Sequence, residues 1–104
     1  MNTQNEIPVE LKKYFWDTIF EKLDIYKNKR YIISRLYCYG DLKTIRWIKK
    51  TYKDSDIEDT ARNCRDLKPL VANYLRQQYN LSKEEMAYYR AIKRINYEYW
   101  RVNN

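Results

Sequence analysis

The chain has 104 residues and a mass of 13.0 kDa, enough for one domain with a small core. It contains no histidine and a single glycine, Gly40, while 12 of its residues are tyrosine. Without histidine there is no Ser-His-Asp or Cys-His pair and no imidazole metal ligand. With one glycine, the chain cannot form the glycine-rich loops that hold nucleotide phosphates. These absences favour a binding protein over an enzyme.

Two short helical turns are predicted near the start of the chain. Pro8 suits the first turn of a helix that carries Leu11 and Phe15 and ends near residues 16–17. Residues 20–23, with the spacing Phe-x-x-Leu, predict a second short turn.

A longer helix is predicted between Asp24 and Gly40. Its apolar positions recur with the 3.6-residue period of an amphipathic helix: Ile25, Ile32, Leu36 and Tyr39. Asp24 is a suitable N-cap, and Gly40 is placed to supply the left-handed residue with which many helices end. Residues 31–39 also have high strand propensity, so a strand is the alternative for this segment.

Asp41, directly after Gly40, predicts the N-cap of the next helix. The residues expected to face the core are Leu42, Ile45, Ile48 and Tyr52. Another face of this helix is positively charged and carries Lys43, Arg46, Lys50 and Lys53. This segment is therefore expected to be amphipathic, with a strongly basic outer face.

Two shorter helices, residues 56–64 and 69–79, are predicted on either side of a break near Asp66. Ser55 or Asp56 is expected to cap the first helix, and Pro69 occupies the first turn of the second. The expected inward positions are Ile57, Ala61 and Cys64 in the first helix and Leu70, Val71, Tyr74 and Leu75 in the second. The second helix should end by Asn80.

The last predicted helix begins at a capping box, residues 82–85, and runs to the C-terminus. Its apolar residues are spaced 4-3-4-3 as in two coiled-coil heptads: Tyr88, Ile92, Ile95, Tyr99 and Val102. We expect this seam to dock on the rest of the domain, with self-association as the alternative.

Together these elements predict an all-α fold: a single compact bundle of five or six short helices with a longer amphipathic C-terminal helix. Residues 8–87 form the expected core of the domain, and residues 88–104 form a C-terminal extension. The start of the chain has no apolar signal region, and no segment is long enough to span a membrane. We therefore expect a cytoplasmic protein in which Cys38 and Cys64 are packed thiols.

No catalytic residue, cofactor or metal ion is predicted. Asp54, Ser55 and Asp56 resemble the start of an EF-hand loop, but the sixth and twelfth positions are Asp59 and Arg65 instead of Gly and Glu. Acidic residues at this place instead suit the positive end of a helix dipole. The two cysteines also lack a recognisable activating partner in the sequence.

The basic charge is concentrated in residues 25–54, which carry nine basic and two acidic residues, a net +7 equal to that of the whole chain. This segment is the predicted surface for an acidic partner protein. Its candidate binding residues are Lys27, Arg30, Arg35, Lys43, Arg46, Trp47, Lys50 and Lys53. A second basic stripe on the last helix consists of Arg90, Lys93, Arg94 and Arg101.

The alternative function is a small DNA-binding repressor. Helices 56–64 and 69–79 have the length and spacing of a helix-turn-helix. The second helix would then read base edges and phosphates with Lys68, Asn73, Arg76 and Gln77. Residues 25–54 would add phosphate contacts that do not depend on base sequence. The oligomeric state is left open.

The order of several short motifs resembles a known family. These motifs are Phe15-Trp16-Asp17, Phe20-x-x-Leu23-Asp24, Gly40-Asp41-Leu42, Arg46-Trp47, Leu67, Ala72-Asn73-Tyr74 and Leu81-Ser82-Lys83-Glu84-Glu85. Residues 8–87 are similar to uncharacterised small prokaryotic proteins often encoded beside abortive-infection-type nucleotidyltransferase toxins. The resemblance implies an antitoxin-like partner of such a toxin and carries no catalytic residues. Members commonly have a Ser/Thr-rich segment where this chain has residues 68–71, Lys-Pro-Leu-Val.

Overall fold

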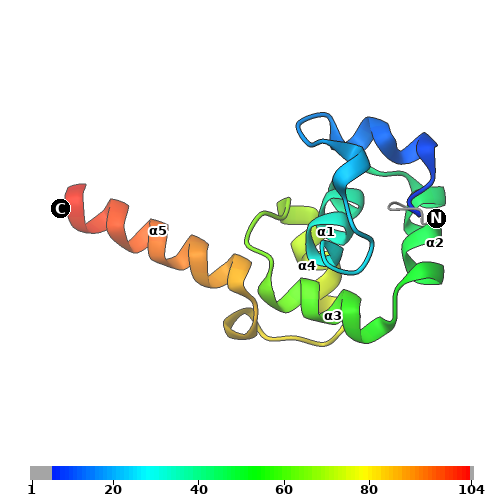
Figure 1. The fold of residues 1–104 in the computed structure, drawn as a ribbon. Helices are drawn as coiled ribbons and strands as arrows, with labels where there is room; N and C mark the ends of the chain where they lie inside the picture. The colour runs from blue at the N-terminus through cyan, green and yellow to red at the C-terminus, as the bar shows by residue number, and fades with distance from the viewer. Residues whose placement is uncertain (1–5, 104) are drawn as a thin grey trace.

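The computed structural model describes residues 6–103, which are helical with short connections and contain no strand (Figure 1). The elements are η1 (Val9–Phe15), η2 (Phe20–Lys22), α1 (Lys29–Tyr39), α2 (Leu42–Thr51), α3 (Asp54–Asn63), α4 (Pro69–Gln78), η3 (Lys83–Glu85) and α5 (Ala87–Asn103), where η denotes a 3-10 helix. This confirms the all-α prediction and the longer C-terminal helix. The alternative of a strand over residues 31–39 is wrong, because α1 occupies this segment.

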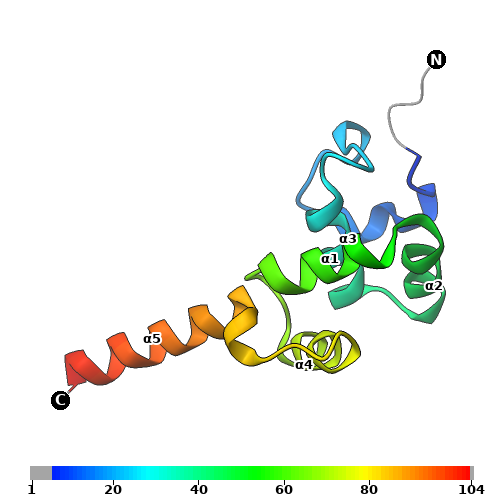
Figure 2. The ribbon, with the colours of Figure 1, turned by 90° about the horizontal axis from the view of Figure 1, so that it is seen from below.

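Helix α1 lies at the centre of the molecule, in contact with α2, α3 and η1 (Figures 1 and 2). Ile32, Ile33 and Leu36 of α1 are completely buried, and so is Ile48 of α2. The aromatic side chain of Phe15 reaches this core from η1, as the sequence predicts. Burial of these large side chains is the main driving force that holds the short helices together.

The predicted N-cap of α1 is wrong, because the helix begins at Lys29 and not after Asp24. The Asp24 carboxylate instead accepts hydrogen bonds from the backbone N–H groups of Tyr26 and Lys27, at 2.9 and 2.7 Å. The Asn28 side chain closes this turn by accepting from the Asp24 N–H, at 2.8 Å. A local turn built by Asp and Asn side chains therefore replaces the first helical turn.

Gly40 ends α1, but not in the predicted left-handed conformation, since its φ of −83° and ψ of 173° are open to any residue. What favours glycine is space. A Cβ at this position would lie 2.6 Å from the carbonyl oxygen of Leu36 and 2.6 Å from the Thr44 methyl group. Gly40 thus allows α1 and α2 to follow each other with a very close turn.

Helix α2 begins as predicted, with the Asp41 side chain accepting from the Thr44 N–H at 2.9 Å. Ile48 and Tyr52 are buried and Ile45 is partly buried, but Leu42 is exposed, contrary to prediction. Tyr39, predicted to face inward from α1, is also exposed. Both residues flank the Gly40 turn, where the chain leaves the core.

Helices α3 and α4 form the predicted pair around the break near Asp66, with Pro69 in the first turn of α4. Helix α3 begins at Asp54, earlier than predicted, so neither Ser55 nor Asp56 is its N-cap. The Asp56 carboxylate lies inside the first turn and accepts from the N–H of Lys53 at 3.4 Å.

The core positions of this pair are only partly those predicted. Ile57 and Ala61 of α3 and Leu75 of α4 are buried. Leu70 and Tyr74 are exposed, and Cys64 is only partly buried. Ala72, which the apolar pattern did not mark, is completely buried instead.

The predicted capping box forms, but it begins the short turn η3 and not the long helix, since the Ser82 N–H donates to the Glu85 carboxylate at 2.8 Å. After the buried Met86, α5 begins and points away from the other helices (Figure 2). The prediction that its apolar seam docks on the domain is wrong beyond Tyr88. The molecule is consequently elongated, with principal extents of 58 × 29 × 22 Å.

Candidate protein-interaction surface

The basic residues of α1 are paired with acidic residues and do not form a free surface. The Lys29 Nζ lies 2.7 Å from the Asp56 carboxylate, and the Arg30 guanidinium binds Asp59 with two hydrogen bonds, at 2.7 and 3.1 Å. The hydrogen bond from Arg30 lowers the pKa of Asp59, as the one from Lys29 lowers the pKa of Asp56. Arg30, predicted to contact a partner, therefore connects α1 to α3.

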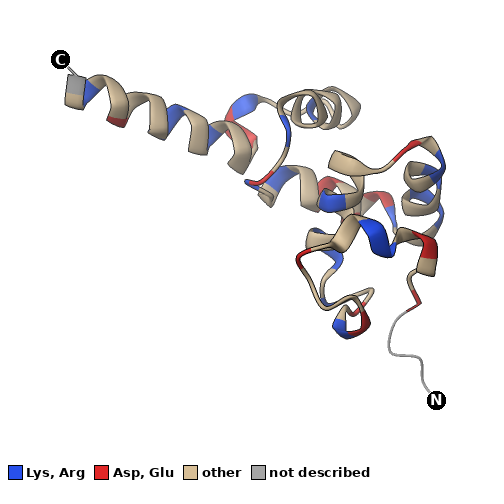
Figure 3. Ribbon diagram, turned by 90° about the horizontal axis from the view of Figure 1, so that it is seen from above, with Lys and Arg blue, Asp and Glu red and all other residues tan. Residues whose placement is uncertain are grey.

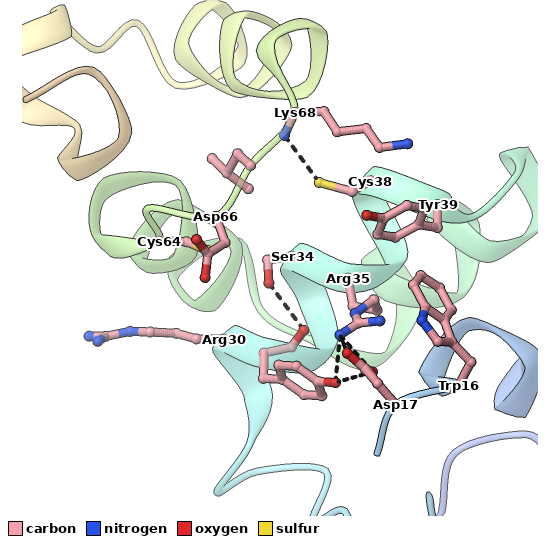
Figure 4. A pocket seen from close by; sticks show the side chains of 12 residues that line it. Trp16, Asp17, Arg30, Ser34, Arg35, Cys38, Tyr39, Cys64, Asp66 and Lys68 are labelled. Carbon is pink, nitrogen blue, oxygen red and sulfur yellow. Dashed lines mark hydrogen bonds and ion pairs between the residues drawn. The ribbon is translucent and has the colours of Figure 1, made fainter. Parts of the chain in front are cut away.

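Arg35, also predicted to contact a partner, is the centre of an aromatic cluster (Figure 4). Its side chain is only 13% exposed, and its Nη2 lies 2.9 Å from the Asp17 carboxylate. The guanidinium carbon lies 4.6 Å from the ring centre of Trp16 and 5.1 Å from that of Tyr31. These contacts hold the segment after η1 against α1, so Arg35 stabilises the fold.

The basic residues of α2, in contrast, make no ion pair with any residue that the structure describes. Lys43, Arg46 and Lys50 follow each other at i, i+3 and i+7 on the exposed side of the helix. Lys49 of α2 is also exposed, and Lys53 is exposed in the short connection between α2 and α3. The Lys and Arg positions of this region are blue in Figure 3. We call these five residues the basic face of α2. The sequence predicted four of them as binding residues.

A hollow of about 400 Å³ lies beside the basic face, between η1 and the start of α2. Its apolar walls include the half-buried rings of Tyr14 and Trp47, and Trp47 also packs edge-on against Tyr52 with ring centres 6.1 Å apart. Lys13 and Lys43 stand beside it, together with the carboxylates of Glu10 and Asp41. Trp47 is a predicted binding residue, whereas Lys13 and Tyr14 were not predicted, because η1 lies far from α2 in sequence.

The residues predicted to read DNA lie on or just before α4 but do not form one free surface. The Arg76 Nη2 donates to the Asn73 side chain at 3.1 Å, and the Arg76 Nε is buried. The ammonium group of Lys68 lies 4.1 Å from the ring centre of Tyr39. Gln77 is exposed. Two of the four residues are therefore engaged with each other.

The two cysteines line a hollow of about 600 Å³ between α1 and the segment before α4 (Figure 4). The Cys38 Sγ accepts a hydrogen bond from the Lys68 N–H at 3.4 Å, and burial raises the pKa of Cys38. Both cysteines are free thiols and partly buried. A raised pKa disfavours the thiolate form of Cys38.

The second predicted stripe lies on α5, and its members have different environments. Arg90 donates to the Glu84 carbonyl oxygen at 2.8 Å, and Arg101 lies 3.5 Å from the Glu98 carboxylate. Lys93 and Arg94 are exposed. Lys27, predicted with the main basic surface, is exposed in the turn before α1 and lies on a different element from the basic face of α2.

Within residues 6–103 no group of three or more His, Cys, Asp or Glu side chains is arranged to hold a metal ion. In the same segment no helix is long and apolar enough to cross a membrane. Searches of curated proteins and of solved structures give no match. The model of DUF6922, a family of unknown function, matches residues 10–61, from η1 into α3, so the basic face of α2 lies within the matched segment. With half of its length matched, the chain belongs to the DUF6922 family.

Proposed function

We propose that this protein is a non-enzymatic interaction module that binds an acidic partner protein through the basic face of α2. The observation that carries the proposal is the contrast between the two basic helices. The cations of α1 are neutralised by Asp17, Asp56 and Asp59, whereas those of α2 face solvent without an acidic partner among the described residues. Concentrated positive charge without a partner accelerates and orients association with an acidic surface.

The adjacent hollow favours a protein over a nucleic acid as the partner. Its Tyr14 and Trp47 walls suit an apolar or aromatic side chain that anchors a protein interface. Charge complementarity would then guide the partner protein to α2, and the hollow would bind one of its apolar side chains.

The resemblance to proteins encoded beside nucleotidyltransferase toxins makes such a toxin the first partner to test. Phosphoryl-transfer enzymes of this kind hold magnesium ions with carboxylates, which gives their clefts a negative potential. A small basic protein that covers such a cleft would act as an antitoxin by excluding the nucleotide substrate. This role requires no catalytic residue on the antitoxin itself.

The test is to co-express the chain with the product of its neighbouring gene and to measure copurification and affinity. The variant Lys43→Glu with Lys50→Glu is compared with Lys22→Glu with Arg65→Glu, which changes the net charge equally at exposed cations outside α2. We expect the α2 variant to lose ~10-fold or more in affinity, and the control to bind like the wild type. The affinity of the wild type should also decrease as salt is raised.

Two results would contradict the proposal. One is a wild-type chain that elutes separately from the neighbouring gene product when both are abundant. The other is equal weakening by both double variants, since binding would then depend on net charge and not on α2. The DNA-binding alternative is tested in parallel with the chain's own promoter fragment at low salt, where retardation that Lys43→Glu with Lys50→Glu abolishes would favour a repressor.

A further inference from the structure

The apolar seam of α5 leaves the core gradually and remains uncovered at its far end. The exposure of its residues rises along the helix, from 8% for Tyr88 and 37% for Ile92 to 64% for Ile95, 70% for Tyr99 and 77% for Val102. The seam is thus continuous with the hydrophobic core at one end and exposed to solvent at the other. Four large apolar side chains in one helical row are an unusual surface for a monomeric protein.

The exposed part of α5 is also too short to be a stable helix by itself. From Ile92 to Val102 it makes few contacts with the rest of the chain, which touches α5 through η3 and α3 near its start (Figure 1). Isolated helices shorter than ~12–15 residues are marginal in water even with favourable sequences. A partner that buries the seam would stabilise this segment.

The charges on α5 indicate what kind of partner fits the seam. With 3.6 residues per turn, the positions that border the seam are occupied by Ala91, Asn96 and Glu98. The cations lie on the opposite half of the helix: Arg90, Lys93, Arg94 and Arg101. An acidic partner helix would place its charges beside the seam, where α5 offers no cation to meet them. A second copy of the same seam meets no such mismatch, and the like charges of the two helices point away from the contact.

We propose that α5 pairs with α5 of a second copy of this chain, so that the two seams bury each other. The projection of α5 makes this contact accessible, because the helix extends beyond the other elements (Figure 2). Helix α2 lies at the opposite end of the molecule from the end of α5 (Figure 1). The dimer therefore leaves both basic faces open for the proposed acidic partner.

The test is sedimentation equilibrium of the full chain over a series of concentrations, together with circular dichroism of the same samples. The wild type should change from 13.0 kDa to twice that mass as concentration rises, and its helix content should rise in parallel. Ile95→Glu should raise the dimer dissociation constant ~100-fold or more, because each copy would bury a charge in the seam. Tyr97 lies on the far side of α5 and is similarly exposed, so Tyr97→Glu is the matched control and should dimerise like the wild type.

Salt dependence separates this contact from association through the basic surfaces. Because the cations lie away from the seam, dimerisation should be unchanged or stronger between about 50 and about 500 mM salt. The proposal is overturned if the wild type stays at 13.0 kDa up to ~200 µM, or if Ile95→Glu and Tyr97→Glu dimerise equally well. Thermal unfolding of each variant, at a concentration at which the wild type is a monomer, shows whether the other helices remain folded, and since both sites are exposed we expect no change there.

Discussion

The hydroxyl group of Tyr37 is buried without a hydrogen-bond partner among the described residues, and removing it should stabilise the protein. Tyr37 lies on α1, its side chain is almost completely buried, and its ring packs near that of Tyr74. Burial raises the pKa of Tyr37 to about 12, which shows how strongly this environment disfavours charge. The substitution Tyr37→Phe keeps the ring and deletes only the unpaired hydroxyl.

The expected magnitude comes from the cost of an unsatisfied buried polar group. Such a group costs ~1–3 kcal/mol, because its hydrogen bonds to water are lost and not replaced. The Phe variant avoids this cost and retains the apolar contacts of the ring, so we expect a gain of ~1 kcal/mol. For a domain of this size that gain corresponds to an increase in Tm of roughly 4–8 °C.

Tyr52 provides a control with the opposite sign. Its side chain is as deeply buried, but its hydroxyl donates to the carbonyl oxygen of Ile25 at 2.7 Å and so connects α2 to the segment before α1. Tyr52→Phe deletes this hydrogen bond and leaves a buried carbonyl unsatisfied, which should cost ~1–2 kcal/mol. Tyr97→Phe, at an exposed site on α5, should leave the stability unchanged.

The measurement is thermal and urea unfolding of the three variants, monitored by circular dichroism. A decrease in the free energy of unfolding of Tyr37→Phe as large as that of Tyr52→Phe would refute this prediction. That result would mean that the Tyr37 hydroxyl is satisfied in solution, by water or by a rearranged neighbour.

Three further predictions concern pH, packing and the aromatic cluster. The free energy of unfolding should be level between about pH 5 and 7, since the chain has no histidine. It should decrease as the pH falls below 3.8, because the pKa values of Asp56 and Asp59 are lowered in the folded state, which therefore binds protons less readily than the unfolded state. Gly40→Ala should destabilise the protein by ~1–3 kcal/mol in urea unfolding, because the added Cβ would collide with the Leu36 carbonyl. Arg35→Ala should cost ~2 kcal/mol and separate the Trp16 segment from α1, visible as a change in the intensity of tryptophan fluorescence when the guanidinium leaves the Trp16 ring, and an unchanged spectrum would contradict this.

Elements marked by specific local chemistry could be predicted from the sequence. Asp41 is the N-cap of α2, and Pro69 begins α4. The Asp41 side chain satisfies a backbone N–H of the first turn, and Pro69 has no N–H to leave unsatisfied, so both signals are independent of the surrounding structure. The capping box at residues 82–85 also forms. The long helix does not start at this box, however, since Met86 is pulled into the core and separates η3 from α5.

Features that depend on distant segments could not be predicted in this way. The apolar period of α4 includes Leu70 and Tyr74, yet the structure exposes both and buries Ala72, because the packing of α4 against other helices decides which of its sides is covered. The periodic seam of α5 is apolar over its whole length, but only Tyr88 at its start is buried by the part of the chain that the structure describes. A period shows which side of a helix is apolar, and it does not show whether anything in the same chain covers that side.

The same limit explains why the basic residues of one segment have two different roles. Lys29 and Arg30 look like Lys43 and Lys50 in sequence, and only the position of α3 distinguishes them, since its acidic residues reach α1 and not α2. Charge reversal should therefore have a different effect in each of the two sets. Arg30→Glu should lower stability, because it places two carboxylates together at Asp59, whereas reversal at Lys50 should leave stability unchanged and weaken binding of an acidic partner. If both reversals affected only stability, the charge of α2 would serve the fold, and the proposed interaction surface would have to lie elsewhere.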